Sequence, residues 1–68
     1  METIVKNVLV HNKGCNGCKR FNRDVMVTMF TTSEESVTEF NDFFLSTEQA
    51  ENLVKDLQIV LKINKEDK

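Results

Sequence analysis

The residues best suited to chemistry lie close together in the N-terminal third of the chain. His11, Cys15 and Cys18 form an H-x3-C-x2-C pattern that contains both cysteines and the single histidine of the sequence. Two cysteines with this spacing in a glycine-containing turn are typical of a zinc site, in which His11 would be a third ligand. Structural zinc takes four ligands, so Asp24, a water molecule or a second subunit would have to complete the site.

The same cysteine pair has two further interpretations. Lys13, Lys19 and Arg20 place positive charge near the thiols, and such charge favours redox chemistry by stabilising a thiolate. Redox-active C-x2-C pairs usually accompany a βαβ unit, whereas the pattern after Cys18 predicts a strand. We therefore favour the third interpretation, in which Cys15 and Cys18 are small apolar residues that pin the connection between two strands and bind no cofactor.

A cluster of basic side chains surrounds this turn. It consists of Lys13, Lys19, Arg20 and Arg23, which could contact a phosphate backbone. The net charge of −2, however, differs from the positive excess of most nucleic-acid-binding proteins. Nucleic-acid binding is therefore the weaker expectation for this cluster.

The rest of the sequence contains no pattern that predicts an enzyme. It has no glycine-rich phosphate loop that leads into a helix. Its single histidine cannot be placed beside a nucleophile and an orienting acid from the sequence. We therefore expect a non-enzymatic protein.

The length of the chain limits its architecture. A chain of 68 residues predicts one domain over residues 1–68, with residues 65–68 as a frayed tail. Domains this short often need a disulfide, a metal ion or a partner subunit, because their core buries little apolar surface. The apolar fraction of 40% and the charged fraction of 29% are those of a globular protein.

The sequence also bears on where the protein works. No apolar run approaches the roughly 20 residues that span a bilayer, and the alternating N-terminus lacks the apolar stretch of a signal peptide. We therefore expect a cytoplasmic protein without membrane contact. The small size and the Asn- and Lys-rich composition suggest a bacterial or phage accessory protein.

Apolar residues predict three β-strands, over residues 3–11, 21–31 and 37–45. Short connections make sequential strands antiparallel neighbours. Residues 33–40 also fit a short helix capped by Ser33, but Thr38 and the apolar run that follows favour a strand.

The C-terminal segment predicts one amphipathic helix over residues 47–63. Ser46 and Gln49 form a capping-box pattern at its start. Its apolar residues recur three or four positions apart and form one stripe, the helix stripe, which comprises Ala50, Leu53, Val54, Leu57, Val60 and Leu61. The predicted fold is therefore α+β, a three-stranded antiparallel sheet followed by one helix.

Side chains alternate along each strand, so the sheet has two faces, and both are apolar. The first face carries Ile4, Val8, Val10, Val25, Val27, Met29, Val37, Phe43 and Leu45. The second face carries Val5, Leu9, Met26, Phe30, Phe40 and Phe44. A single helix can cover only one of them, so we expect the other face to be exposed.

An exposed apolar face usually marks an interface. Burying each large apolar side chain contributes roughly 1.5–3 kcal/mol, so we expect self-association, as a homodimer, through the second face. Ile59 and Ile63 of the helix would extend this interface. There are two alternatives. A different protein could bind the second face, or other parts of the same chain could shield it from water.

These expectations predict a small protein-binding or regulatory module that acts by occupying a protein surface. A zinc-stabilised or thiol-active module that uses Cys15 and Cys18 is the first alternative. A nucleic-acid-associated regulator that uses the basic cluster is the second.

Overall fold

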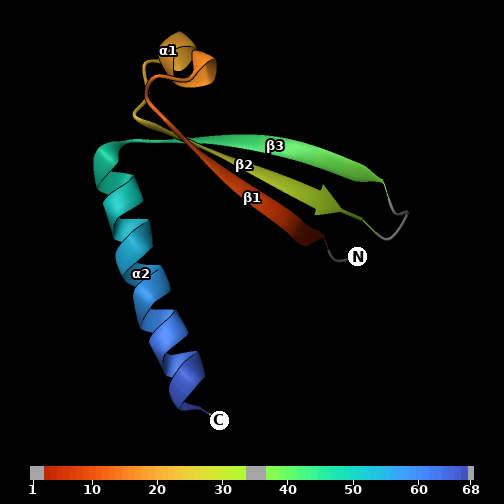
Figure 1. Ribbon diagram of the computed structural model, residues 1–68, viewed down its shortest axis with the longest axis vertical. Helices are drawn as coiled ribbons and strands as arrows, with labels where there is room; N and C mark the ends of the chain where they lie inside the picture. Colours follow the sequence, from red (N-terminus) through yellow and green to blue (C-terminus); the bar gives the residue numbers. More distant parts are fainter. Residues whose placement is uncertain (1–2, 34–36, 68) are drawn as a thin grey trace.

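The computed structural model describes residues 3–33 and 37–67 of the chain. The sheet and the C-terminal helix confirm the predicted α+β arrangement (Figure 1). In chain order, the elements are β1 (Ile4–Asn12), α1 (Asn16–Phe21), β2 (Val25–Thr32), β3 (Thr38–Leu45) and α2 (Thr47–Glu66).

The three strands form one antiparallel sheet in the order β1-β2-β3, as the short connections predict. β2 is the central strand, and Val27 pairs with Val10 on one side and Phe43 on the other. The strand predicted over residues 37–45 is confirmed from Thr38 onward. Residues 34–36, part of the ambiguous segment before it, lie outside the described residues.

The predicted start of the second strand was wrong. Residues Asn16–Phe21 form a short helix, α1, and β2 begins only at Val25. Cys15 caps the start of α1, and Asn22 ends it in the left-handed conformation, with φ 53°. Asparagine tolerates this conformation better than most residues, so its backbone N–H can bond to the Cys18 carbonyl. This local capping outweighs the strand preference of the flanking residues.

The strand register changes two assignments to a sheet face, those of Ile4 and Val5. The pairing of β1 with β2 shifts between Val5 and Asn7, which is a β-bulge or irregularity. Val5 therefore pairs with Thr31, in phase with the first face, whereas Leu9 pairs with Thr28 in phase with the second. Ile4 pairs with Thr32, in phase with the second face. Because one extra residue reverses side-chain alternation, Ile4 and Val5 exchange the groups in which the sequence pattern placed them.

Helix α2 begins at Thr47, where the predicted helix begins. The Ser46 side chain accepts a bond from the Gln49 N–H, and the Gln49 side chain accepts one from the Ser46 N–H. This is the predicted capping box. The helix ends at Glu66, three residues beyond its predicted end, so Lys65 and Glu66 of the expected tail are helical, and residue 68 lies outside the described residues.

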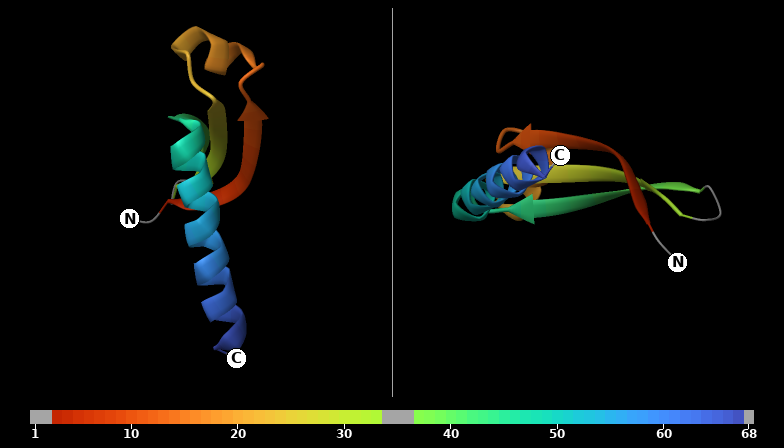
Figure 2. Two further views of the ribbon diagram at one scale, coloured as in Figure 1. Left: turned by 90° about the vertical axis from the view of Figure 1, so that its left-hand side faces the viewer. Right: turned by 90° about the horizontal axis from the view of Figure 1, so that it is seen from below.

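The expectation that the helix covers a sheet face was wrong. None of the described residues of α2 is buried, and the helix extends away from the sheet as one arm of a V (Figures 1 and 2). Ser46 is the one residue between β3 and α2. A connection this short leaves no chain with which to fold the helix back over the strand it follows.

The interior of the chain is small. Among residues 3–33 and 37–67, three side chains are buried: Cys18, Val27 and Thr28. The Thr28 hydroxyl donates a hydrogen bond of 2.7 Å to Asp42 Oδ1, which satisfies this buried polar group. The radius of gyration is 14.5 Å, whereas a compact domain of this length has about 11 Å. Most apolar side chains of one chain therefore face water.

Candidate functional site

Two parts of the molecule can support a function: the exposed apolar surface and the turn that contains both cysteines. The helix stripe forms the larger part of the apolar surface. Leu53, Val54, Leu57, Val60 and Leu61 are all exposed, and Ile59 and Ile63 are each 57% exposed. A surface helix normally buries such a stripe against its own domain. Helix α2 has this apolar stripe, but the stripe is not packed against the rest of the chain.

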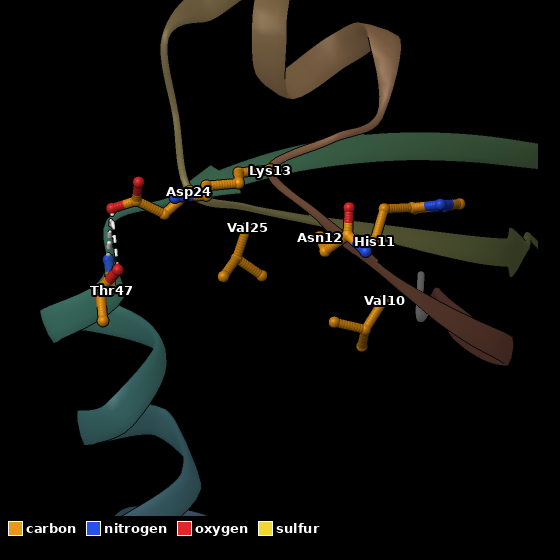
Figure 3. A pocket seen from close by; sticks show the side chains of 7 residues that line it. All are labelled: Val10, His11, Asn12, Lys13, Asp24, Val25 and Thr47. Atoms are coloured by element: carbon orange, nitrogen blue, oxygen red, sulfur yellow. Dashed lines mark hydrogen bonds between the residues drawn. The ribbon is translucent and has the colours of Figure 1, made fainter.

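The sheet adds apolar surface on its first face. Val10 is 69% exposed, and Val8 and Phe43 are also exposed. The central Val27 is buried, with neighbours in the strands on either side. Val10 and Val25 line an open pocket of about 540 Å³ that also reaches Thr47 at the start of α2. Figure 3 shows both valines on the side of the sheet from which α2 extends. The sheet and α2 thus border a shared open pocket, in which the two valines lie among polar side chains.

The junction between the sheet and α2 is held by Asp24. Its Oδ2 accepts hydrogen bonds from the Thr47 hydroxyl at 2.9 Å and from the Thr47 backbone N–H at 3.0 Å (Figure 3). These bonds, with a smaller contribution from the positive charges of Lys13 and Arg23, hold the pKa of the Asp24 carboxyl below its ordinary value. The carboxylate therefore ties the end of α1 and the start of β2 to the first turn of α2.

The second face is the interface predicted from the sequence, and the structure divides it. Phe40 is 68% exposed and Leu9 is exposed, whereas Met26, Phe30 and Phe44 are half-buried. The Phe30 and Phe40 rings lie across from each other on β2 and β3, with centroids 6.2 Å apart. The free part of the second face is therefore the end that carries Leu9, Phe30 and Phe40.

Helix α1 covers the other end of the second face. The Phe21 ring lies 4.8 Å from the Phe44 ring, centroid to centroid. A Cβ on Gly17 would lie 2.7 Å from the Met26 sulfur and 3.2 Å from a Phe44 ring carbon, so the helix backbone packs closely on the sheet. Gly17 is needed here for this approach, and not for an unusual backbone angle.

The cysteine turn is the second candidate site, and α1 gives it a defined geometry. Cys15 is the N-cap of α1, and its sulfur accepts a hydrogen bond of 3.3 Å from the Cys18 backbone N–H. Cys15 is half-buried, whereas Cys18 is only 1% exposed. The two thiols therefore lie within one helical turn, one reachable from solvent and the other enclosed.

The surroundings of the two thiols shift their acidities in opposite directions. The hydrogen bond from the Cys18 N–H lowers the pKa of the Cys15 thiol, because it stabilises the thiolate. Burial, and then the neighbouring Cys15 side chain, raise the pKa of the Cys18 thiol. Cys15 is therefore the more readily ionised thiol, and the thiolate is the reactive form of cysteine.

The structure brings together only part of the predicted zinc site. Cys15 and Cys18 meet, but the described part of the chain has no group of three or more His, Cys, Asp or Glu side chains that could hold a metal ion. His11 lies on β1, paired with Met26, and lines the pocket beside Asp24 instead. The cysteine pair can therefore supply two metal ligands, and a second molecule would have to supply the others.

The basic cluster lies on and around α1. Lys13, Lys19, Arg20 and Arg23 are all exposed, and the Arg20 guanidinium lies 5.5 Å from the Phe21 ring centroid. This placement puts the positive charge at the end of the molecule that also holds the cysteine turn.

No protein-family model, no curated protein and no solved structure matches this chain. Within residues 3–33 and 37–67, neither helix is long and apolar enough to cross a bilayer. The function is therefore inferred from the residues and their geometry.

Sequence reasoning missed the helix that follows Cys15. The available signal was Asn22, since asparagine often ends a helix in the left-handed conformation. It also missed Asp24 as the residue that holds α2, because the two residues of this contact are 23 positions apart in the sequence.

Proposed function

We propose that this protein is a small non-enzymatic protein-binding module that acts as a homodimer. The observation that carries the proposal is the exposure of α2, a helix of 20 residues whose apolar stripe is not packed against its own sheet. Most helix stability in proteins comes from packing of the apolar face, and the helix stripe lacks that packing within one chain. A partner that covers the helix stripe would supply it.

The surface area of the chain supports the same proposal. One chain exposes 5887 Å², about a third more than the roughly 4,400 Å² of a compact protein of its mass. The excess is about 1,500 Å² for each chain, so two chains could remove about 3,000 Å² from water. Interfaces of obligate homodimers bury about 2,000–5,000 Å² in total. The unpacked surface is thus of the size that a dimer of this kind needs.

A second copy is the occupant best matched to this surface. Each chain exposes both an apolar helix stripe and an apolar sheet, so two copies related by a two-fold axis can cover the helix of one with the apolar surface of the other. The net charge of −2 for each chain opposes this only weakly. The second face, with Phe40 at its free end, is the part of the sheet that we expect to take part.

The experiment is a mass measurement by light scattering after size-exclusion chromatography at micromolar concentration. A dimer has twice the chain mass of 7.9 kDa. Leu57→Glu places a charge in the middle of the helix stripe and should shift the population to monomer. Gln58→Glu adds the same charge at the neighbouring exposed position and should leave the dimer intact.

A second matched pair tests the sheet. Phe40→Glu should weaken the dimer about tenfold or more, since losing one buried large side chain costs roughly 1.5–3 kcal/mol. Asn41→Glu adds the same charge on the opposite face of β3 and should have a smaller effect. A sharp monomer mass for the unmodified chain across the micromolar range would refute the proposal.

A further inference from the structure

The cysteine turn has a geometry that self-association does not use. The N-cap position of Cys15 and the third helical position of Cys18 place the two side chains on the same side of one turn. Side chains with this spacing on a helix have Cβ atoms about 5–6 Å apart, and a disulfide needs Cβ atoms about 3.5–4.5 Å apart, so the two Cβ atoms must approach by roughly 1–2 Å. The sulfur of Cys15 already lies 3.3 Å from the Cys18 backbone nitrogen. Closure of a bond between the sulfurs therefore needs only local movement.

We propose that Cys15 and Cys18 are a redox-active dithiol, which a small-molecule disulfide converts reversibly into an intrachain Cys15–Cys18 disulfide. This role is additional to the proposed self-association and does not depend on it. Both cysteines are present as thiols in the structure, which is the reduced member of this couple.

The difference in exposure between the two thiols sets the order of the steps. Cys15 is half-buried and can meet a molecule in solution, whereas Cys18 is 1% exposed and cannot. The Cys15 thiolate attacks one sulfur of the disulfide RSSR, a bond forms between Cys15 and that sulfur, and the other half leaves as RS⁻. The Cys15 proton passes to solvent, and RS⁻ takes up a proton from solvent.

The second step occurs within the chain. Cys18 loses its proton and attacks the Cys15 sulfur, which releases the remaining half of the reagent as RS⁻. In total, two thiols are oxidised to one disulfide and RSSR is reduced to two RSH. Cys18 lies within one helical turn of Cys15, and because it is only 1% exposed it is shielded from competing reagents.

A metal site on the same two sulfurs is the competing assignment. It would need at least two further ligands, and the described part of the chain brings no third candidate ligand to the pair. A disulfide needs only the two sulfurs that the structure places together. The geometry of one chain therefore favours the redox assignment.

The test uses the full-length reduced protein with oxidised glutathione as the small-molecule disulfide. After the reaction, free thiols are alkylated and the intact protein is weighed by mass spectrometry. We expect the unmodified chain to lose two hydrogen atoms, carry no glutathione and take up no alkyl group. When the ratio of reduced to oxidised glutathione is varied, the fraction of chains in the disulfide form should change reversibly with a single midpoint.

Two serine variants test the order of the steps. Cys18→Ser should retain one glutathione on Cys15, because the resolving thiol is missing. Cys15→Ser should react at least about tenfold more slowly than Cys18→Ser, because the remaining Cys18 thiol is only 1% exposed and a reactive thiol must be accessible. Circular dichroism on each variant checks that the fold is retained.

Several outcomes would overturn the proposal. For the chain with its original sequence, three results would do so after treatment with excess oxidised glutathione. They are alkylation of both thiols, a glutathione adduct that persists, and a disulfide between two chains. Zinc co-purifying at one ion for every two chains and protecting all four thiols would assign the pair to a shared metal site instead. The experiment on the chain with its original sequence decides whether the disulfide forms. A serine variant that fails to fold therefore does not affect that decision.

Discussion

At the scale of single residues, a few polar atoms define the geometry around the cysteine turn and the junction with α2. Asp24 follows the end of α1 and bonds twice to Thr47. Asn22 ends α1 and lets the chain turn into β2. Each residue acts through a backbone group that would otherwise lack a partner.

The Asp24 contact should make stability depend on pH. The folded-state pKa of Asp24 is lowered mainly by the Thr47 hydroxyl, so its contribution is present above the unfolded pKa and is lost as pH falls through the folded value. We expect the unmodified chain to melt at a higher temperature than Asp24→Asn near neutral pH. The difference should shrink below about pH 4, near the ordinary Asp pKa. Thermal melts across this range check the prediction, and a difference that is constant with pH would contradict it.

At the scale of elements, α2 is defined by its cap and its stripe, and not by contact with its own sheet. The capping box satisfies two backbone N–H groups at its start. Over its length, however, the helix gains little from its own sheet. Capping therefore accounts for a larger share of its stability within one chain than it does for a packed helix.

The cap can be tested separately from the stripe. Ser46→Ala removes the oxygen that accepts from the Gln49 N–H and should lower the free energy of unfolding by about 1 kcal/mol. Ser46→Gly is the control, because glycine at an N-cap costs only a few tenths of a kcal/mol. Urea unfolding followed by circular dichroism at one fixed protein concentration measures both changes. Equal losses for the two variants would show that the hydroxyl bond does not stabilise α2.

At the scale of the whole molecule, the chain is more open than a compact domain of its length. Its principal extents are 42 × 33 × 15 Å, and its two layers diverge instead of packing together (Figure 2). Small domains gain stability from burial, and this chain buries only three of the described side chains. The proposed association would supply the burial that one chain lacks.

Association should make the melting temperature depend on concentration. Binding between folded chains stabilises the folded state by mass action, so each tenfold dilution of a dimer costs about 1.4 kcal/mol of apparent stability. We expect the melting temperature to fall on dilution, with loss of the α2 helical signal in the same transition. Thermal melts at several concentrations measure this. A melting temperature that does not change with concentration would contradict a dimer and favour a stable monomer.

The sequence by itself determined the local elements. The capping box at Ser46 and the spacing of the helix stripe predicted α2. β-branched alternation predicted β1, and Thr38 with the apolar run that follows it predicted β3. It also predicted that apolar surface exceeds what one helix can cover. These features depend on neighbours within a few residues, so they can be read from the order of side chains.

The tertiary structure decided how those elements meet. The one-residue connection at Ser46 and the contact between Asp24 and Thr47 direct α2 away from the sheet. The close approach of Gly17 to Phe44 places the cysteine turn over the end of the second face. The Asp24–Thr47 and Gly17–Phe44 contacts each join residues that are distant in the sequence. The alternation of side chains along one strand or helix carries no information about such pairs. The open shape and the burial of Cys18 are therefore results of tertiary packing, whereas the proximity of the two thiols comes from the local turn of α1.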